Sequence, residues 1–391
     1  MISSFEFFAP THVYFGKKQE ERVGEILKQG NYKKVLVHYG SHSAKASGLL
    51  ERVLSSLKKY NINYIELGGV VANPELSKVR EGITLAKKEN VDFILAIGGG
   101  SVIDSAKAIG YGVVNEGDVW DYYEKKKTVT GCLPIGAIVT IAAAGSEMSD
   151  SSVITNEDGW LKRGLSSDYA RCRFAIMNPE LTMTLPLYQT ASGATDIILH
   201  TMERYFVKEN SMELTDQFAE GLMRTVMKHA RILMQDPDCY ESRAEIMWAG
   251  TNAHNNVTGS GSVGDWACHQ LEHELSGLYH VAHGAGLAAV WKSWAMYVYE
   301  EKISRFAQYA RNVMGICEED EKECAVKGIL ATEAFFKEIG MPTSIHELGI
   351  DLTEEDIDTL AYKCSFRNTR TIGKFKVLNI EDMKKIYRMA K

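Results

Sequence analysis

Apolar and polar positions follow different patterns in the two halves of the chain. Up to about residue 180, short apolar runs that end in turns predict buried strands, at residues 34–40, 62–67, 91–97 and 131–140. Between them, residues 48–59 and 75–90 carry apolar side chains at helical spacing. Alternating strands and helices predict a mainly parallel sheet with helices on both faces.

Beyond Pro186 the pattern is helical. Apolar residues recur at helical spacing in long segments, at residues 191–206, 211–234, 241–255, 265–276 and 300–313. The Asn178-Pro179 and Leu185-Pro186 pairs punctuate the change of pattern. We therefore predict an α/β domain over residues 1–186 and an all-helical domain over residues 187–391.

Composition and charge narrow the class of protein. Hydrophobic residues make up 45% and charged residues 24% of the 391 residues, which is typical of a globular protein. The net charge of −7, with Lys125–Lys127 as the richest basic run, argues against nucleic-acid binding. The apolar runs are too short to span a membrane, and the first residues do not resemble a signal peptide. Seven scattered cysteines without a Cys-x-x-Cys pair suit a reduced compartment, so we expect a cytoplasmic protein.

A glycine-rich turn follows the third predicted strand. Gly98-Gly99-Gly100-Ser101 opens a helical segment that continues to Gly110. Glycines let the backbone approach a pyrophosphate, and the helix start offers free N–H groups and the positive dipole end. Ser101 is a candidate cap and Asp104 suits the first turn. The alternative is a tight, capped turn that binds no ligand.

A second glycine motif, Gly259–Gly264, fits the Gly-x-Gly-x-x-Gly pattern. It lies between two predicted helices, however, with no strand before it. We interpret it as an interhelical loop.

The end of the first predicted strand bears on which nicotinamide cofactor binds. An acidic residue there would bind the ribose hydroxyls and repel a 2′-phosphate. The strand instead ends Tyr39-Gly40-Ser41, with His38, His42 and Lys45 close by. This favours NADP(H) over NAD(H).

The histidines are concentrated in the helical half. Four of eleven fall within residues 269–283, and His269 and His273 lie at i and i+4 on one helix face. Asp196 and His200 show the same spacing in an apolar helix, where a buried carboxylate and imidazole must be paired or coordinated. One carboxylate with two or three imidazoles suits Zn²⁺ or Fe²⁺. The alternative for each histidine alone is an ordinary core residue.

Together these motifs resemble the iron-containing (group III) alcohol dehydrogenases, most closely the branch of butanol dehydrogenases and NADPH-dependent aldehyde reductases. The likeness covers nearly the whole chain, through Pro10–Lys17, Asn73-Pro74, Gly98–Asp104, Thr140–Met148, Asp196–His200, Asp265–Gly277 and His283-Gly284. Two positions depart from the family pattern. Ala144 replaces the usual threonine before Gly-Ser-Glu, and Ala282 replaces the proline before the last ligand, with an additional imidazole at His280.

The resemblance implies a Rossmann-like nucleotide-binding domain, an all-helical metal domain of dehydroquinate-synthase-like architecture, and an active site in the cleft between them. It implies one Fe²⁺ or Zn²⁺ ion with four ligands, Asp196, His200, His269 and His283. It implies His273 beside the nicotinamide. The cofactor contacts that it implies are Gly40, Ser41, Asn73, Gly99, Gly100, Ser101, Asp104, Thr140, Ile141, Ser149 and Lys162.

The resulting hypothesis is an NADP-dependent alcohol dehydrogenase or aldehyde reductase. The ion would polarise the substrate oxygen, and His273 would relay the proton or, alternatively, only orient a ligand. The helical half has few basic residues, which favours short- to medium-chain aldehydes and alcohols such as butanal and butanol over phosphorylated substrates. We expect a homodimer or higher homo-oligomer. The alternatives are a glycerol dehydrogenase, a dehydroquinate-synthase-like lyase, or a non-catalytic metal-binding protein.

Overall fold

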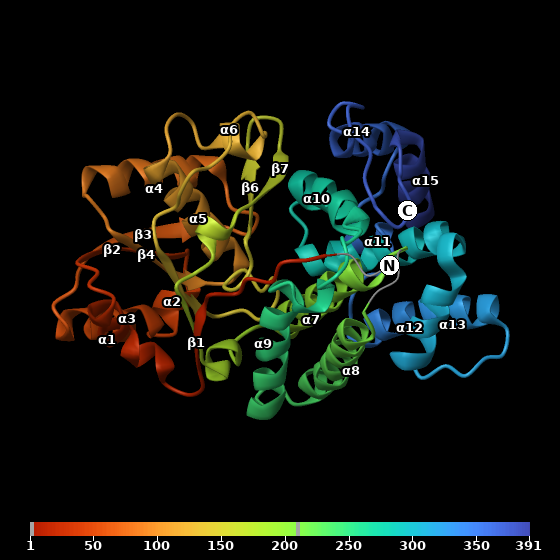
Figure 1. Cartoon of the computed structure of the whole chain (residues 1–391), viewed down its shortest axis with the longest axis horizontal. Helices are drawn as coiled ribbons and strands as arrows, with labels where there is room; N and C mark the ends of the chain where they lie inside the picture. The colour runs from red at the N-terminus through yellow and green to blue at the C-terminus, as the bar shows by residue number, and fades with distance from the viewer. Residues whose placement is uncertain (1–3, 209–211) are drawn as a thin grey trace. The chain divides into compact units, whose positions relative to one another are not determined.

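The computed structural model describes residues 4–208 and 212–391. The chain divides into two compact units. The first spans Phe8–Thr184, and the second contains Leu185–Lys391 together with the described residues before Phe8. In Figure 1 the first unit runs from red to yellow, and Leu185–Lys391 of the second unit run from green to blue. The predicted combination of a parallel α/β domain and a helical domain is confirmed.

Six parallel strands form the main sheet in the described part of the first unit, in the order β1-β8-β5-β4-β2-β3. Their bounds are β1 (His12–Phe15), β2 (Lys34–Gly40), β3 (Asn63–Val70), β4 (Phe93–Gly98), β5 (Ile135–Val139) and β8 (Phe174–Met177). The four strands predicted from the sequence are β2, β3, β4 and β5. The chain goes from β2 outward to β3 and then returns to β4 on the other side of β2. In open parallel sheets, ligands bind at the carboxyl ends of strands where the order reverses in this way.

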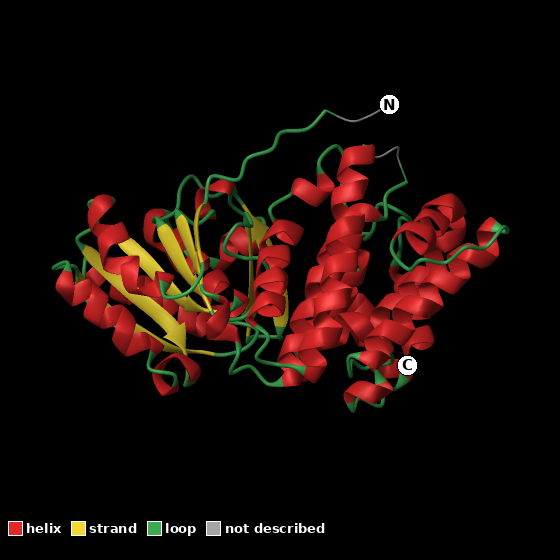
Figure 2. Ribbon diagram, turned by 90° about the horizontal axis from the view of Figure 1, so that it is seen from below, coloured by secondary structure: helices red, strands yellow, loops and turns green. Residues whose placement is uncertain are grey.

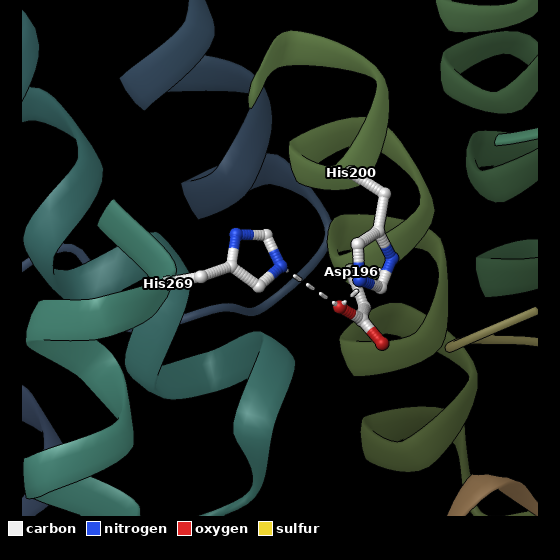
Figure 3. Close-up of side chains that lie close together, drawn as sticks. All are labelled: Asp196, His200 and His269. Carbon is white, nitrogen blue, oxygen red and sulfur yellow. Dashed lines mark ion pairs between the residues drawn. The ribbon is translucent and has the colours of Figure 1, made fainter. Parts of the chain in front are cut away.

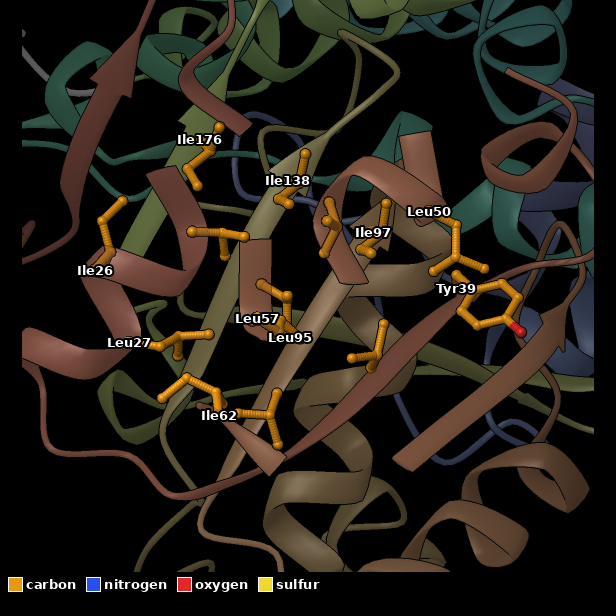
Figure 4. Close-up of a cluster of buried hydrophobic side chains, with 14 of the residues drawn as sticks. Ile26, Leu27, Tyr39, Leu50, Leu57, Ile62, Leu95, Ile97, Ile138 and Ile176 are labelled. Atoms are coloured by element: carbon orange, nitrogen blue, oxygen red, sulfur yellow. The ribbon is translucent and has the colours of Figure 1, made fainter. Parts of the chain in front are cut away.

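Helices cover both faces of this sheet (Figure 2). They are α1 (Val23–Gln29), α2 (Ser43–Ala46), α3 (Leu49–Lys59), α4 (Leu76–Lys88) and α5 (Gly100–Val114). The unit also contains the short helix α6 (Trp120–Tyr123). Because successive side chains of a strand point to opposite faces, Val35, Val37 and Tyr39 of β2 pack in one apolar cluster with α1 and α3 (Figure 4). His38 points to the other face, where its ring meets Ser105 of α5.

A separate antiparallel hairpin, β6 (Ser151–Asn156) and β7 (Leu161–Ser166), follows β5. The sequence pattern did not predict it. The Thr155 N–H donates to the Pro74 carbonyl at 2.8 Å, which fixes the hairpin to the loop after β3.

The second unit is built from helices. They are α7 (Leu187–Tyr205), α8 (Glu213–Gln235), α9 (Tyr240–His254), α10 (Ala267–Tyr279), α11 (His283–Val298), α12 (Ile303–Asn312), α13 (Glu321–Glu338), α14 (Glu354–Cys364) and α15 (Ile380–Ala390). The predicted segments correspond to α7, α8, α9, α10 and α12. The expected start of one of them, Ser211, lies outside the described residues.

Helix α10 extends beyond residue 276, where the sequence pattern predicted its end. Helix α10 continues to Tyr279 and ends at His280, whose φ of 56° is left-handed. Gly259–Gly264 does lie between helices, α9 and α10, as predicted. Among the described residues, no helix is both long enough and apolar enough to cross a membrane.

Candidate metal and nucleotide sites

Helix α7 carries the first part of the candidate metal site. Asp196, His200 and Glu203 lie at i, i+4 and i+7, so all three occupy one face of the helix. Nearly the whole helix is buried, and Asp196 and His200 are each less than 5% exposed. The His200 Nδ1 lies 3.4 Å from the Asp196 Oδ1.

Helix α10 adds His269, whose Nε2 lies 3.8 Å from the same Asp196 oxygen (Figure 3). The start of α10 is held by the buried carboxylate of Asp265. It accepts the N–H of Ala267 at 3.1 Å and those of Lys374 and Phe375 at 2.6 and 2.7 Å. Burial raises the pKa of Asp265 to about 7. These contacts fix the start of α10 and thereby the position of His269.

His283 is the first residue of α11, and its Nε2 lies 3.7 Å from the Asp196 Oδ1. The following Gly284 allows this approach, because a Cβ there would overlap the Ser192 carbonyl oxygen of α7 and lie 2.8 Å from its carbon. His280, by contrast, is exposed at the left-handed end of α10. The geometry therefore favours His283 over His280 as the fourth ligand.

The buried atoms of this cluster fit a divalent metal ion. Asp196 Oδ1, His200 Nδ1 and His269 Nε2 have no hydrogen-bond partner within residues 4–208 and 212–391. One ligand atom from each of these residues lies within 4.8 Å of the others. Leaving three buried polar atoms unsatisfied is costly, whereas one carboxylate and two imidazoles are a usual donor set for Zn²⁺ or Fe²⁺.

The electrostatics of the cluster agree with this assignment. Burial and the neighbouring His254 and His269 rings hold the pKa of His200 well below its usual value. Burial also opposes a charge on His269, but the Asp196 and Glu203 carboxylates beside its ring outweigh burial and raise the pKa of His269 to about 9. The neutral His200 ring therefore offers a lone pair, and the carboxylates beside His269 attract a positive charge, which a divalent ion supplies while displacing the proton.

Several residues around the ligands were not predicted from the sequence. The His254 ring lies 4.1 Å from that of His200, and the Trp266 ring lies 5.4 Å from that of His269. Glu203 and Glu272 contact the Nδ1 atoms of His269 and His283. The predicted catalytic residue His273 is half-buried, with its ring 5.7 Å from that of His283.

The predicted nucleotide-binding residues collect at the carboxyl ends of three neighbouring strands. Gly40 ends β2, Gly99 follows β4 and Thr140 follows β5, with Ser41 and Ile141 next in the chain. The Thr140 N–H donates to the Gly98 carbonyl at 3.1 Å. The three segments therefore share one edge of the sheet.

Helix α5 begins at Gly100 with Gly99 as its N-cap. The proposed cap Ser101 instead lies within the first turn, so that expectation is wrong. A Cβ on Gly99 would lie 2.9 Å from the Ile141 Cδ1, and one on Gly100 would lie 2.9 Å from the Ala144 Cβ. Both glycines are therefore required by packing, and they leave the first N–H groups of α5 at the strand end.

Other predicted cofactor residues bind protein groups in the structure. The Asp104 carboxylate accepts hydrogen bonds from the Ser146 hydroxyl and from the Val153 N–H, and burial raises its pKa. Ser149 is fully buried, and its Oγ accepts the Ser151 N–H at 2.8 Å.

Lys162 and Asn73 come from distant segments and meet. The Lys162 Nζ donates to the Asn73 Oδ1 at 2.9 Å. Lys107, which the sequence did not single out, is fully buried, and its Nζ donates to the carbonyls of Ser149 and Ser151 at 2.8 and 2.7 Å. Lys107 thereby attaches the 149–151 segment to α5.

His38 does not contribute to phosphate binding, although its place near the end of β2 suggested that role. Its Nδ1 donates to the Leu67 carbonyl at 2.9 Å, so its Nε2 accepts from the Ser105 hydroxyl at 2.9 Å. Burial lowers the pKa of His38 to about 4, and the ring is neutral near pH 7. Ser41, His42 and Lys45 are exposed.

Comparison with known proteins finds relatives of one family along nearly the whole chain. Residues 10–179 match the family described as iron-containing alcohol dehydrogenase, and residues 190–391 match the C-terminal model of the Fe-containing alcohol dehydrogenase family. The chain is 38% identical to NADH-dependent butanol dehydrogenase A of Clostridium acetobutylicum, with 99% of each chain covered. It is 31% identical to the NADPH-dependent aldehyde reductase YqhD of Escherichia coli, with 100% of each covered. The crystal structure of NADH-dependent butanol dehydrogenase A from Thermotoga maritima has a TM-score of 0.96 and 40% identity, and covers 100% of this chain and 99% of that one.

Proposed function

The chain belongs to the iron-containing alcohol dehydrogenase family, and from this premise we propose that it transfers hydride reversibly between NADP(H) and short- to medium-chain aldehydes and alcohols. The family predicted from the sequence motifs is thereby confirmed. An alcohol dehydrogenase of this family requires a divalent metal and a nicotinamide cofactor. The preference for NADPH, the four-ligand set and substrates such as butanal and butanol are the proposal.

The observation that carries the proposal is the convergence of buried, unpartnered ligand atoms on Asp196. In the described part of the chain, Asp196 Oδ1, His200 Nδ1 and His269 Nε2 lack hydrogen-bond partners, and the His283 Nε2 lies 3.7 Å from the same oxygen. His283 is 25% exposed, whereas the other three ligands are almost fully buried. A set of ligands that is more exposed at His283 than at the other three suits a catalytic metal site, which keeps one position open.

Different residues of the chain would bind the metal ion and transfer the proton. When bound, the ion would supply Lewis-acid polarisation of the substrate oxygen, and the nicotinamide would supply or accept the hydride. Asp196, His200, His269 and His283 would hold the ion, and their burial would exclude water from most of its surroundings. His273, one turn beyond His269 and next to His283, would pass the proton, because an imidazole exchanges protons near neutral pH.

The contacts of Arg204, a cation close to His200, support small, uncharged substrates. The Arg204 guanidinium stacks 4.5 Å over the Trp266 ring, and its Nη1 donates to the His200 carbonyl at 3.0 Å. Arg204 is therefore engaged within the protein and supports packing around the site. The relatives that are named for butanol and aldehydes fit this interpretation.

The preference for NADPH rests on the segment after β2. Residues 40–48 contain no Asp or Glu, and Ser41, His42 and Lys45 are exposed there. Small polar and basic side chains can accept a 2′-phosphate, which a carboxylate would repel. Relatives named for NADH and for NADPH both occur, so the residues of this segment carry the proposal.

The test is the oxidation of NADPH, and separately of NADH, with butanal as the acceptor. We expect a higher kcat/KM with NADPH and a loss of turnover on chelation. Ser41→Asp should shift the preference toward NADH by about tenfold or more, since it places a carboxylate at the strand end. Ser55→Asp, on the exposed face of α3, is the matched control and should leave the preference unchanged. No turnover of any aldehyde by metal-loaded protein would refute the proposed function.

A further inference from the structure

We propose that Glu203 and Glu272 are positioning residues, which fix the tautomer and the orientation of His269 and His283 so that both Nε2 atoms face one metal ion. This inference rests on the proposed function, because it concerns the same ion. Neither glutamate belongs to the set of ligands.

Glu203 holds His269 by two hydrogen bonds. Its Oε1 accepts the backbone N–H of His269 at 2.9 Å and meets the ring Nδ1 at 2.8 Å. The Glu203 side chain is only 2% exposed, so water does not compete for this contact. A carboxylate only accepts, so the Nδ1 carries the proton and the Nε2 presents its lone pair. That Nε2 lies 3.8 Å from the Asp196 Oδ1.

Glu272 repeats the arrangement on the next pair of helices. Its side chain is fully buried, and its Oε2 makes a short contact with the Nδ1 of His283. The Nε2 of that ring lies 3.7 Å from the same Asp196 oxygen. Gly286 keeps the space for this carboxylate, because a Cβ there would lie 2.7 Å from the Glu272 Oε1 and 2.9 Å from its Cγ.

The two contacts form a series across three helices. Glu203 of α7 orients a histidine of α10, and Glu272 of α10 orients a histidine of α11. If the glutamates served only to join helices, the two rings would have no reason to aim their other nitrogen at one atom. With Asp196, the glutamates place three carboxylates around the ligand atoms, and a buried group of this charge is stable only next to a cation.

The expected consequence is a loss of metal affinity without a loss of ligands. Mutation of the carboxylate behind a metal-binding histidine typically weakens metal binding by about 10- to 100-fold. Glu203→Gln and Glu272→Gln should each raise the Kd for Co²⁺ by about this factor. The absorption spectrum of bound Co²⁺ should also change, because an amide, unlike a carboxylate, can also donate to the Nδ1 and therefore no longer fixes the tautomer of the ring.

Glu220→Gln is the matched control. Glu220 is also buried in the helical unit, at 4% exposure, and its Oε1 accepts from the Tyr205 hydroxyl at 2.7 Å and from the Gln308 amide at 3.0 Å. It contacts none of the four ligands in the described structure. Its variant should unfold at a lower temperature and bind Co²⁺ with the wild-type Kd and spectrum.

The experiment is a chelator competition for Co²⁺ on the full chain, starting with the wild type. If the wild type binds no Co²⁺, the proposed function fails. If the wild type binds and both Gln variants stay within twofold of its Kd with an unchanged spectrum, only the inference about the glutamates is overturned. Gly286→Ala is an independent variant that keeps all four ligands and both glutamates. It should weaken Co²⁺ binding as Glu272→Gln does, and a wild-type Kd would count against the role of Glu272 even if the Gln variants do not fold.

Discussion

Gly284→Ala tests how closely the metal site depends on the packing of α11 against α7. A Cβ at this position would overlap the carbonyl oxygen of Ser192 and lie 2.8 Å from its carbon and 2.9 Å from its Oγ. Backbone atoms cannot rotate out of the way, unlike the end of a flexible side chain. Helix α11 must therefore move relative to α7.

The size of the movement follows from the contact distances. Bringing the Ser192 carbon to an ordinary contact of 3.4 Å requires a shift of at least about 0.6 Å, and the oxygen requires more. Overpacking of this kind costs about 1–3 kcal/mol, and a clash with backbone lies at or above the upper end. His283 precedes Gly284, so the shift also moves the His283 Nε2 away from Asp196. A site that must hold its ligands within about 0.5 Å should then bind metal about tenfold more weakly or worse.

The assay combines urea unfolding of the metal-free protein with a Co²⁺ competition. Gly221→Ala is the control, because Gly221 lies inside α8 and a Cβ there would meet only the Arg224 Nη2 at 3.9 Å. That variant should gain about 0.5–1 kcal/mol from helix propensity and keep the wild-type metal Kd. The reasoning is refuted if Gly284→Ala unfolds at the same urea concentration as the wild type and binds Co²⁺ equally well.

Three further predictions concern single side chains. Asp196→Asn keeps the shape but removes a charge that lies 3.4 to 3.8 Å from nitrogens of three imidazoles. Metal analysis after gel filtration should therefore find less than about one tenth of the wild-type content, and full retention would contradict the ligand assignment. Lys107→Met leaves the carbonyls of Ser149 and Ser151 without their buried donor. The free energy of unfolding, measured in urea, should fall by about 2–4 kcal/mol. An unchanged midpoint of urea unfolding would contradict this prediction. The folded pKa of His38, about 4, lies below the usual 6.5, so the unfolded chain binds the extra proton between these values. The free energy of unfolding should therefore fall by on the order of 3 kcal/mol as the pH drops from about 6.5 to about 4. His38→Gln should abolish that part of the pH dependence. The same pH dependence in the variant would be inconsistent with a buried neutral ring.

Strands β2 and β4 were predicted because each has a nearly continuous apolar run. β2 and β4 are buried on both faces, so hydrophobicity alone reveals them. β1 and β8 have only four residues each, which is too short for a period to be recognised. Strand β7 (Leu161–Ser166) carries polar residues and a glycine, so its composition does not predict a strand. Its hydrogen-bonded pairing with β6 stabilises it.

Helices α11 and α15 were also not predicted from the sequence, for different reasons. Helix α11 is apolar around most of its circumference, so its sequence has no polar stripe from which a helical period could be recognised. Helix α15 did carry a usable signal, a capping box from Asn379 to Asp382 followed by apolar residues at Met383, Ile386 and Tyr387. It was therefore predictable and was not predicted.

At the metal site, spacing identified residues that share a helix, and tertiary structure supplied the rest. Asp196 and His200 are visible as an i, i+4 pair in an apolar helix. Glu203 and Glu272 lie at regular helical distances from the ligands, but nothing in the sequence indicates which histidine each contacts. His254 reaches His200 from α9, and that proximity exists only after folding.

The central claim is that one divalent ion, held by Asp196 and three histidines, makes this chain an alcohol dehydrogenase. The most direct test is to remove all metal with a chelator and to measure NADPH oxidation with butanal while Fe²⁺ or Zn²⁺ is returned stepwise. We predict no turnover without metal and a linear recovery that stops at one ion per chain. Full activity in the metal-free protein, or a recovery that ignores the amount of ion added, would contradict it.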